Sequence, residues 1–146
     1  MAGTITAHGR DPAGRGRFVT PEADRFLAKA RQTLEHDEAI LGIGLGEEAA
    51  RTAYLAAFHA AQALIYERTG REAKTHRGVH RQFALLPKDE ASLSADLRRF
   101  LAQAYDLKAV ADYATGPDAV IPLDRAAFAI ETARRFLVAV EQLLER

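Results

Sequence analysis

The alanine-rich run at residues 47–68 constrains the fold of this chain more than any other feature. Its apolar residues repeat with the spacing of an α-helix and share one face, which holds Ala50, Tyr54, Ala57, Phe58, Ala61 and Ile65. Small alanine side chains let other helices approach from several sides, so we expect this helix at the centre of the fold. Glycines bound the run: three alternate over residues 42–46 and Gly70 follows it. The spacing of the first three fits no nucleotide-binding fingerprint, so we interpret them as a turn.

Four further helices are predicted from start and stop signals. Thr20 followed by Pro21 is typical of a helix start, and Ser92 is the expected N-cap of a later helix. Pro87 and Gly116 each end a helical pattern. These helices are expected at residues 21–41, 76–86, 93–111 and 123–144. No segment alternates as a strand would, so the predicted class is all-α: an antiparallel up-and-down four-helix bundle with one short extra helix.

Composition limits the classes of function. The 146 residues suit one domain, and the net charge of zero provides no overall attraction to nucleic acid or membrane. The absence of cysteine excludes disulfides, cysteine-ligated zinc and thiol catalysis. Residues 1–18 are predicted to be a flexible N-terminal tail, and residues 19–146 the helical domain. The N-terminus lacks the apolar core of a signal peptide, so we expect a cytoplasmic protein.

Residues 68–81, called here the basic segment, concentrate positive charge in a chain that is neutral overall. They contain Arg68, Arg71, Lys74, Arg77 and Arg81 against Glu72 alone. The centre of the segment begins the short helix, where free backbone N–H groups attract anions. We expect phosphate groups of RNA or a nucleotide to bind through Lys74, Thr75, His76, Arg77 and Arg81. The alternative is that Thr75 is only an N-cap and the segment a solvated loop that pairs with an acidic partner or with the acidic C-terminal helix.

The histidines allow several interpretations. His59 lies on the central helix and is interpreted as a buried histidine that bonds to a neighbouring helix. Alternatively, Arg51, Tyr54 and His59 form a polar cluster in an inter-helix or dimer cleft, although Tyr54 is expected mainly as a core residue. His76 and His80 are four residues apart and share a helix face, but no third ligand accompanies them. We therefore predict no metal site and no cofactor.

Three segments in order resemble the prokaryotic HEPN superfamily. They are the helical run Ala53–Ala61, the turn Lys74–Val79 and the helix end Ala111–Tyr113. The resemblance covers about residues 20–145 and is strongest to the small stand-alone proteins of bacteria and archaea. It implies an up-and-down bundle, commonly a homodimer. It also implies a frequent nucleotidyltransferase-fold partner in toxin–antitoxin systems and, for many members, metal-independent ribonuclease activity.

The ribonuclease signature of that family is an arginine followed, after four to six residues, by a histidine near the end of the penultimate long helix. At that place this chain has Lys108 and Tyr113, with Asp112 beside them. Lysine cannot grip a phosphate bidentately, and tyrosine titrates near pH 10 and is a poor base at neutral pH. A match in spacing occurs elsewhere, from Arg71 to His76. The usual catalytic pair is therefore not at its expected place.

These observations predict a HEPN-like module in a toxin–antitoxin or stress and defence context. It would bind a nucleotide, RNA or a nucleotidyltransferase-fold partner through the basic segment, or serve only to assemble with that partner. The alternative is a metal-independent ribonuclease toxin. It would use His76 as general base with Arg71 or Arg77 as the phosphate-stabilising cation, or a set of residues around Lys108 and Tyr113. Residues expected at a cleft or dimer interface are Arg51, Tyr54, His59, Lys108, Asp112 and Tyr113.

Overall fold

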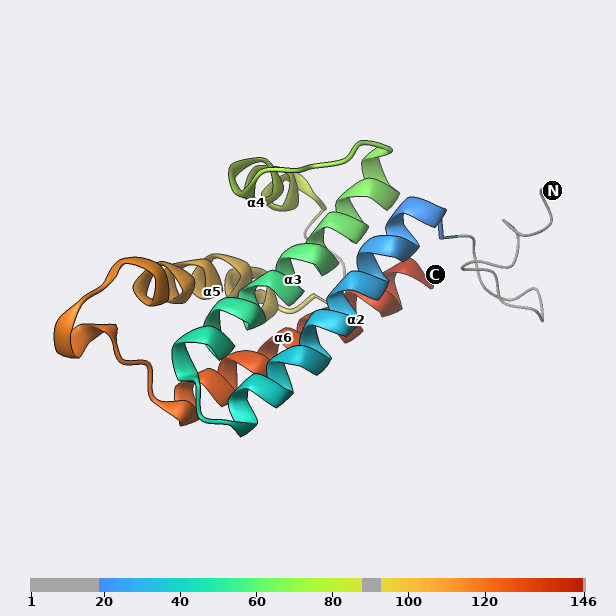
Figure 1. The fold of residues 1–146 in the computed structure, drawn as a ribbon. Coiled ribbons are helices and arrows are strands. Elements are labelled where there is room, and N and C mark those ends of the chain that lie inside the picture. Colours follow the sequence, from blue (N-terminus) through green and yellow to red (C-terminus); the bar gives the residue numbers. More distant parts are fainter. Residues whose placement is uncertain (1–18, 88–92, 146) are drawn as a thin grey trace.

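Helices make up all the regular structure in residues 19–87 and 93–145, which are the residues that the computed structural model describes (Figure 1). The elements are α2 (Pro21–Gly42), α3 (Gly46–Thr69), α4 (His76–Leu85), α5 (Ala95–Tyr113), the 3-10 turn η1 (Gly116–Ala119) and α6 (Leu123–Leu144). The predicted all-α class is thus confirmed. None of the described helices is both long and apolar enough to cross a membrane. The predicted tail at residues 1–18 lies outside the described residues.

Polar contacts at the helix ends fix the direction of each long helix. The backbone N–H and hydroxyl of Thr20, before α2, both donate to Glu67 Oε1 near the end of α3, at 3.0 Å. The N–H of Ile121, before α6, donates to Glu47 Oε2 in the first turn of α3, at 2.7 Å. Therefore α2 runs opposite to α3, and α6 runs parallel to it. With α5 antiparallel to α3, these helices form the predicted up-and-down bundle, and α4 is the short extra helix (Figure 1).

Helix α3 is the central helix, as the alanine pattern predicts. It packs against α2, α4, α5 and α6, and the predicted face is buried throughout. Its first residue shows how closely the chain approaches itself. A Cβ atom on Gly46 would lie 2.4 Å from the carbonyl oxygen of Ile121, so a side chain at position 46 would push the start of α6 away. Gly70 ends α3 with a φ of 74°, a left-handed conformation that glycine adopts without steric cost.

The start of α5 differs from the prediction. Ser92 lies outside the described residues, and the observed N-cap is Ser94, whose hydroxyl accepts a hydrogen bond from the N–H of Leu97 at 3.3 Å. The helix therefore begins at Ala95, and the expected start at residue 93 is wrong. Leu93 is buried as expected, but it precedes the helix. Two serines stand close together here and either is a suitable cap, so local sequence alone does not choose between them.

A carboxyl group lies buried in α2 where the apolar face packs into the bundle. Asp37 is 0% exposed, and neither of its carboxylate oxygens has a hydrogen-bond partner among the described residues. Burial raises the pKa of Asp37 from 3.8 to about 8, because ionisation would leave a charge without solvent. The carboxyl is therefore mostly protonated at neutral pH. The sequence analysis did not single out this residue.

Replacing Asp37 by asparagine is expected to stabilise the protein more as the pH rises. The pKa of this carboxyl is higher in the folded than in the unfolded chain, so its burial weakens folding progressively from its unfolded pKa up to about pH 8. The stability gained by Asp37→Asn over wild type should therefore grow by about 1.4 kcal/mol per pH unit between about pH 5 and pH 8. Urea unfolding across that range measures the gain.

The matched control is Glu35→Gln, which removes an exposed carboxyl from the same helix and should leave the pH dependence as in wild type. A gain for Asp37→Asn that stayed constant with pH would contradict the prediction.

Candidate functional site

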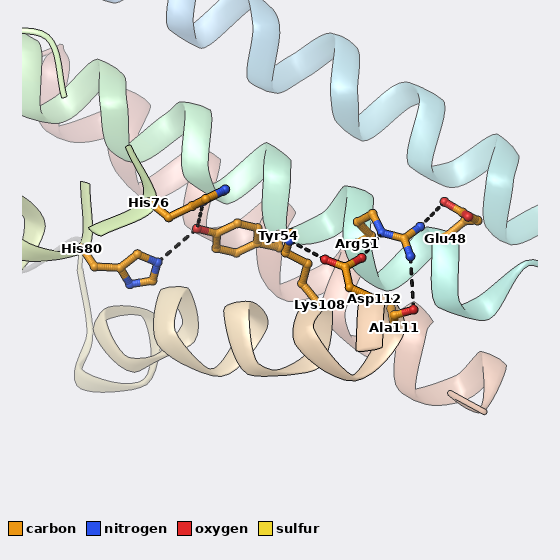
Figure 2. Close-up of polar contacts among 8 residues, drawn as sticks. All are labelled: Glu48, Arg51, Tyr54, His76, His80, Lys108, Ala111 and Asp112. Atoms are coloured by element: carbon orange, nitrogen blue, oxygen red, sulfur yellow. Dashed lines mark hydrogen bonds and ion pairs between the residues drawn. The ribbon is translucent and has the colours of Figure 1, made fainter. Parts of the chain in front are cut away.

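Two polar clusters lie side by side where α4 and α5 pack on α3 (Figure 2). Tyr54 of α3 joins His76 and His80 of α4 in the first, called here the tyrosine–histidine cluster. Arg51 of α3 joins Asp112 and Lys108 of α5 in the second, called here the charged cluster. Arg51 and Tyr54 are one helical turn apart, so the two clusters are neighbours on one face of α3.

The tyrosine–histidine cluster is centred on one hydroxyl group. The side chain of Tyr54 is 0% exposed, and its oxygen lies 2.8 Å from His76 Nδ1 and 3.1 Å from His80 Nε2. Phe58 and Tyr105 complete an aromatic wall: their ring centroids lie 5.0 and 5.6 Å from that of His76. Tyr54 is thus a core residue, as expected, and also a polar partner of two histidines.

Local sequence explains why both histidines face Tyr54. Thr75 caps α4, with its hydroxyl accepting from the N–H of Gly78 at 2.9 Å, and this sets the first turn of the helix. His76 and His80, four residues apart, then lie on the same side of α4. Val79 is buried on the adjoining face and holds that side against the bundle. The predicted helix face is therefore formed, and both histidines meet the hydroxyl of Tyr54 there.

Burial keeps all three groups of this cluster uncharged near neutral pH. It raises the pKa of Tyr54, and the nearby Tyr105 raises it further. It also lowers the pKa of His76, and the ammonium group of Lys108 adds to this effect. The pKa of His80 is lowered by burial first and by His76 second, while Asp106 partly opposes both. A histidine whose pKa lies below its ordinary value of about 6.5 is neutral at pH 7 and can accept a proton.

The charged cluster is organised by Asp112, which binds a cation on each carboxylate oxygen. Oδ1 accepts from Arg51 Nε at 2.6 Å, and Oδ2 accepts from Lys108 Nζ. These bonds, from Lys108 first and Arg51 second, hold the pKa of Asp112 below its usual range. Arg51 also pairs with Glu48 and donates to the carbonyl of Ala111 at 3.2 Å, which satisfies an acceptor in the last turn of α5. The cluster therefore fixes the end of α5 to the start of α3.

Lys108 connects the two clusters electrostatically. Its ammonium nitrogen lies 5.9 Å from the ring centroid of Tyr105, within the range of a cation–π interaction. The same charge lowers the pKa of His76. Because Asp112 holds this flexible side chain in place, the position of the ammonium group relative to His76 depends on the charged cluster.

The basic segment opens onto a different surface. A groove at the junction of α3 and α4 is lined by Arg71, Lys74 and Thr75, among other residues. Among the residues that the structure describes, Arg71, Lys74, Arg77 and Arg81 form no ion pair, whereas Arg68 donates to the carbonyl of Leu143 in α6 at 3.4 Å.

The cationic neighbour of His76 is therefore not the one that the sequence suggested. Arg71 lies beside the groove, whereas the ring of His76 lies against Tyr54, and no hydrogen bond joins the two within the described ranges. Lys108 of α5, far away in sequence, acts on His76 instead. A motif read along the chain could not identify a pairing that forms only when α4 and α5 pack on α3.

His59 lies apart from Arg51 and Tyr54, so the suggested cluster of these three residues is not formed. Five residues beyond Tyr54, it points to another side of α3, since each residue turns an α-helix by about 100°. Its Nδ1 lies 2.9 Å from Gln62 Oε1 on the same helix, not on a neighbouring one as expected. Gln62 in turn donates to the carbonyl of Ala73 at 2.8 Å. His59 thus supports the loop that leads into α4.

Two further observations limit the candidate chemistry. Tyr113, which stands where the ribonuclease signature has its histidine, is 79% exposed at the end of α5. Within residues 19–87 and 93–145, no three His, Asp or Glu side chains gather as a metal site would require. The sequence pattern gave no signal for Tyr105, and it did not predict that Arg51, Lys108 and Asp112 bind one another.

Comparison with known proteins places this architecture among related chains. A family model described as the HEPN domain matches residues 23–143. A UPF0332 protein of Archaeoglobus fulgidus is 35% identical over 92 residues, which are 63% of this chain and 72% of that protein. The crystal structure of TT1696 from Thermus thermophilus is also similar, with a TM-score of 0.69 and 27% identity. That similarity covers 83% of this chain and 97% of TT1696.

Removing the charge of Lys108 is expected to raise the pKa of His76 toward its ordinary value. The ammonium group disfavours a second positive charge nearby, so Lys108→Met should ease protonation of His76 while its burial remains. Histidine titration by NMR measures the change. Lys29→Met is the matched control, because the charge of Lys29 lowers the pKa of His59 instead. A response of His76 to the control, or none to Lys108→Met, would contradict this assignment.

Proposed function

Because this chain belongs to the HEPN domain family, we propose that it is a module that binds RNA or a nucleotide through the basic segment. The observation that carries this proposal is the groove at the junction of α3 and α4. Arg71 and Lys74 line it together with Thr75 and one acidic residue, Glu72, and the first turn of α4 begins there. Two cations beside a helix N-terminus are suited to a phosphate group.

The charge of the basic segment supports the same proposal. Its exposed cations are not neutralised by ion pairs in the described part of the chain, whereas Arg51 and Lys108 in the charged cluster are both paired with Asp112. Exposed cations bind phosphates mainly by releasing counterions, which requires no base-specific contact. The expected ligand class is therefore a phosphate-bearing polymer or nucleotide, bound with strong dependence on salt.

The double variant Arg71→Ala/Lys74→Ala is expected to weaken RNA binding and its dependence on salt. Loss of two phosphate contacts should lower the slope of log affinity against log salt by about 2. Fluorescence anisotropy with a labelled RNA over a salt series measures both. The matched control is Arg25→Ala/Arg125→Ala, which removes two exposed cations from α2 and α6. Equal losses in both variants would show that binding is not localised at the groove.

A second candidate function is a metal-independent ribonuclease centred on His76. The observation that favours it is a neutral histidine near a fixed ammonium group. In this candidate mechanism His76 takes the proton of a ribose 2′-hydroxyl, whose oxygen attacks the neighbouring phosphorus. Lys108 stabilises the negative charge that develops on the phosphate oxygens. Lys108 thus takes the role that the sequence pattern suggested for Arg71 or Arg77.

Cleavage of end-labelled RNA in EDTA tests this candidate. His76→Ala is expected to reduce the cleavage rate by at least about 10²-fold, the usual contribution of a general base. Arg71→Ala/Lys74→Ala should mainly raise the RNA concentration that gives the half-maximal rate. Tyr113→Phe serves as the control for the alternative site at the end of α5. If His76→Ala still cleaves RNA but Tyr113→Phe does not, the active residue lies at the end of α5. Binding without cleavage by wild type would leave the module as a binding protein.

We further propose that the protein acts in the cytoplasm as a homodimer and pairs with a nucleotidyltransferase-fold antitoxin. Family membership supports the assembly, since the HEPN resemblance implies both dimers and such partners. Exposed Tyr113, at the end of α5, is available to such an interface. Light scattering of the purified protein tests the dimer, for which a monomeric mass would be the contrary result.

A further inference from the structure

The hydroxyl of Tyr54 has one proton but two nitrogen neighbours. His76 Nδ1 lies 2.8 Å away and His80 Nε2 lies 3.1 Å away, both within hydrogen-bond distance. The hydroxyl can donate to only one of them and must accept from the other. A neutral histidine carries its proton on one ring nitrogen only. Satisfying both contacts therefore requires one histidine with its proton toward Tyr54 and one with its proton on the far nitrogen.

We propose that His76, Tyr54 and His80 form one proton-relay unit with two arrangements. In each arrangement one histidine presents an N–H group to its surroundings, and the other presents a bare ring nitrogen. In the first arrangement, Tyr54 donates to His76 Nδ1 and His80 Nε2–H donates to Tyr54. His76 then carries its proton on Nε2, and His80 Nδ1 is bare. In the second, His76 Nδ1–H donates to Tyr54 and Tyr54 donates to His80 Nε2. His76 Nε2 is then bare, and His80 carries its proton on Nδ1.

Conversion between the two arrangements moves one proton across the unit without changing its charge. When His76 Nε2 takes a proton, the Nδ1 proton of His76 passes to the Tyr54 oxygen. The proton of the Tyr54 hydroxyl passes to His80 Nε2, and His80 Nδ1 releases its own proton. Every group thus ends neutral, and no buried tyrosinate forms as a stable state. This matters because burial disfavours the charged form of Tyr54 and of both histidines.

The two ends of the unit have different surroundings. The nitrogen of His76 that does not bond Tyr54 points away from the hydroxyl (Figure 2). At the other end, His80 lines a groove between α4 and α5, together with Arg98 and Ala102. Of the charged groups of α5, Lys108 lies on the His76 side and lowers its pKa, while Asp106 raises that of His80. In this conversion a proton taken up at His76 leaves at His80, beside the groove.

A catalytic role for this relay rests on the ribonuclease candidate above. Its substrate would be RNA, whose 2′-hydroxyl gives up the proton. His76 is then the catalytic base, while Tyr54 and His80 are positioning residues. They keep the His76 ring neutral as Nε2 takes the proton, and the reverse conversion, in which His80 Nδ1 takes up a proton and His76 Nε2 releases one, restores the bare Nε2. The coupling between the tautomers of His76 and His80 exists in the free protein and does not depend on RNA.

The deciding experiment is long-range ¹H–¹⁵N NMR of the histidine rings in the free protein above their pKa values. The protonated fraction of His76 Nδ1 and that of His80 Nε2 should sum to one, whatever the balance between the two arrangements. In Tyr54→Phe, which keeps the ring and removes the hydroxyl, this complementarity should disappear. His76→Gln should change the tautomer of His80 in wild type but not in Tyr54→Phe. The proposal would be overturned if the two protonated fractions did not sum to one. It would also be overturned if His76→Gln left the tautomer of His80 unchanged.

Cleavage assays separate this inference from the proposed function. If wild type cleaves RNA, Tyr54→Phe and His80→Gln should lower kcat and alter the pH–rate profile while leaving RNA affinity unchanged. If both variants keep the kcat and the pH–rate profile of wild type, the relay has no catalytic role, even if His76 is essential for cleavage. If wild type cleaves no RNA, the ribonuclease candidate and with it the catalytic role fail, and the NMR result alone decides whether the proton linkage exists. Thermal unfolding of Tyr54→Phe checks that its fold is retained.

Discussion

Close packing around α3 is the constraint on which the rest of the structure depends. Most of the buried residues of this helix are alanines, so four other helices approach it at short range. The few large side chains on α3 therefore have fixed and specific neighbours. Tyr54 is fully buried among them, and its hydroxyl reaches the two histidines of α4. A bulkier central helix would hold α4 and α5 further apart, and neither polar cluster would form in this way.

The sequence was sufficient to predict the helices because their signals are local. Thr20, Thr75 and Gly70 end or begin helices as expected, since capping depends on residues only a few positions apart. The start of α5 was predicted wrongly because Ser92 and Ser94 carry the same local signal. Asp37 was not predicted, since its burial depends on how α2 packs and a single polar residue does not disturb the apolar period.

The candidate site was harder to predict because its contacts join distant parts of the chain. The residue types were recognisable: Lys108, Asp112 and His76 were all candidates from sequence. Their pairing was not, since Lys108 affects a histidine more than thirty residues earlier only after α5 folds back on α3. Spacing along the chain instead suggested Arg71, which lies beside a separate groove. The spacing of a motif predicts contacts within one helix but does not predict contacts between helices.

The short length of α4 has a dynamic consequence. A helix of 10 residues is marginal on its own, since isolated helices shorter than about 12–15 residues are unstable in water. Its order depends on tertiary contacts, chiefly buried Val79 and Phe83 and the bonds to Tyr54. Local opening of α4 would carry both histidines away from the hydroxyl together. The two histidine bonds and the helix therefore share one opening equilibrium, and amide hydrogen exchange in α4 reports on the integrity of both.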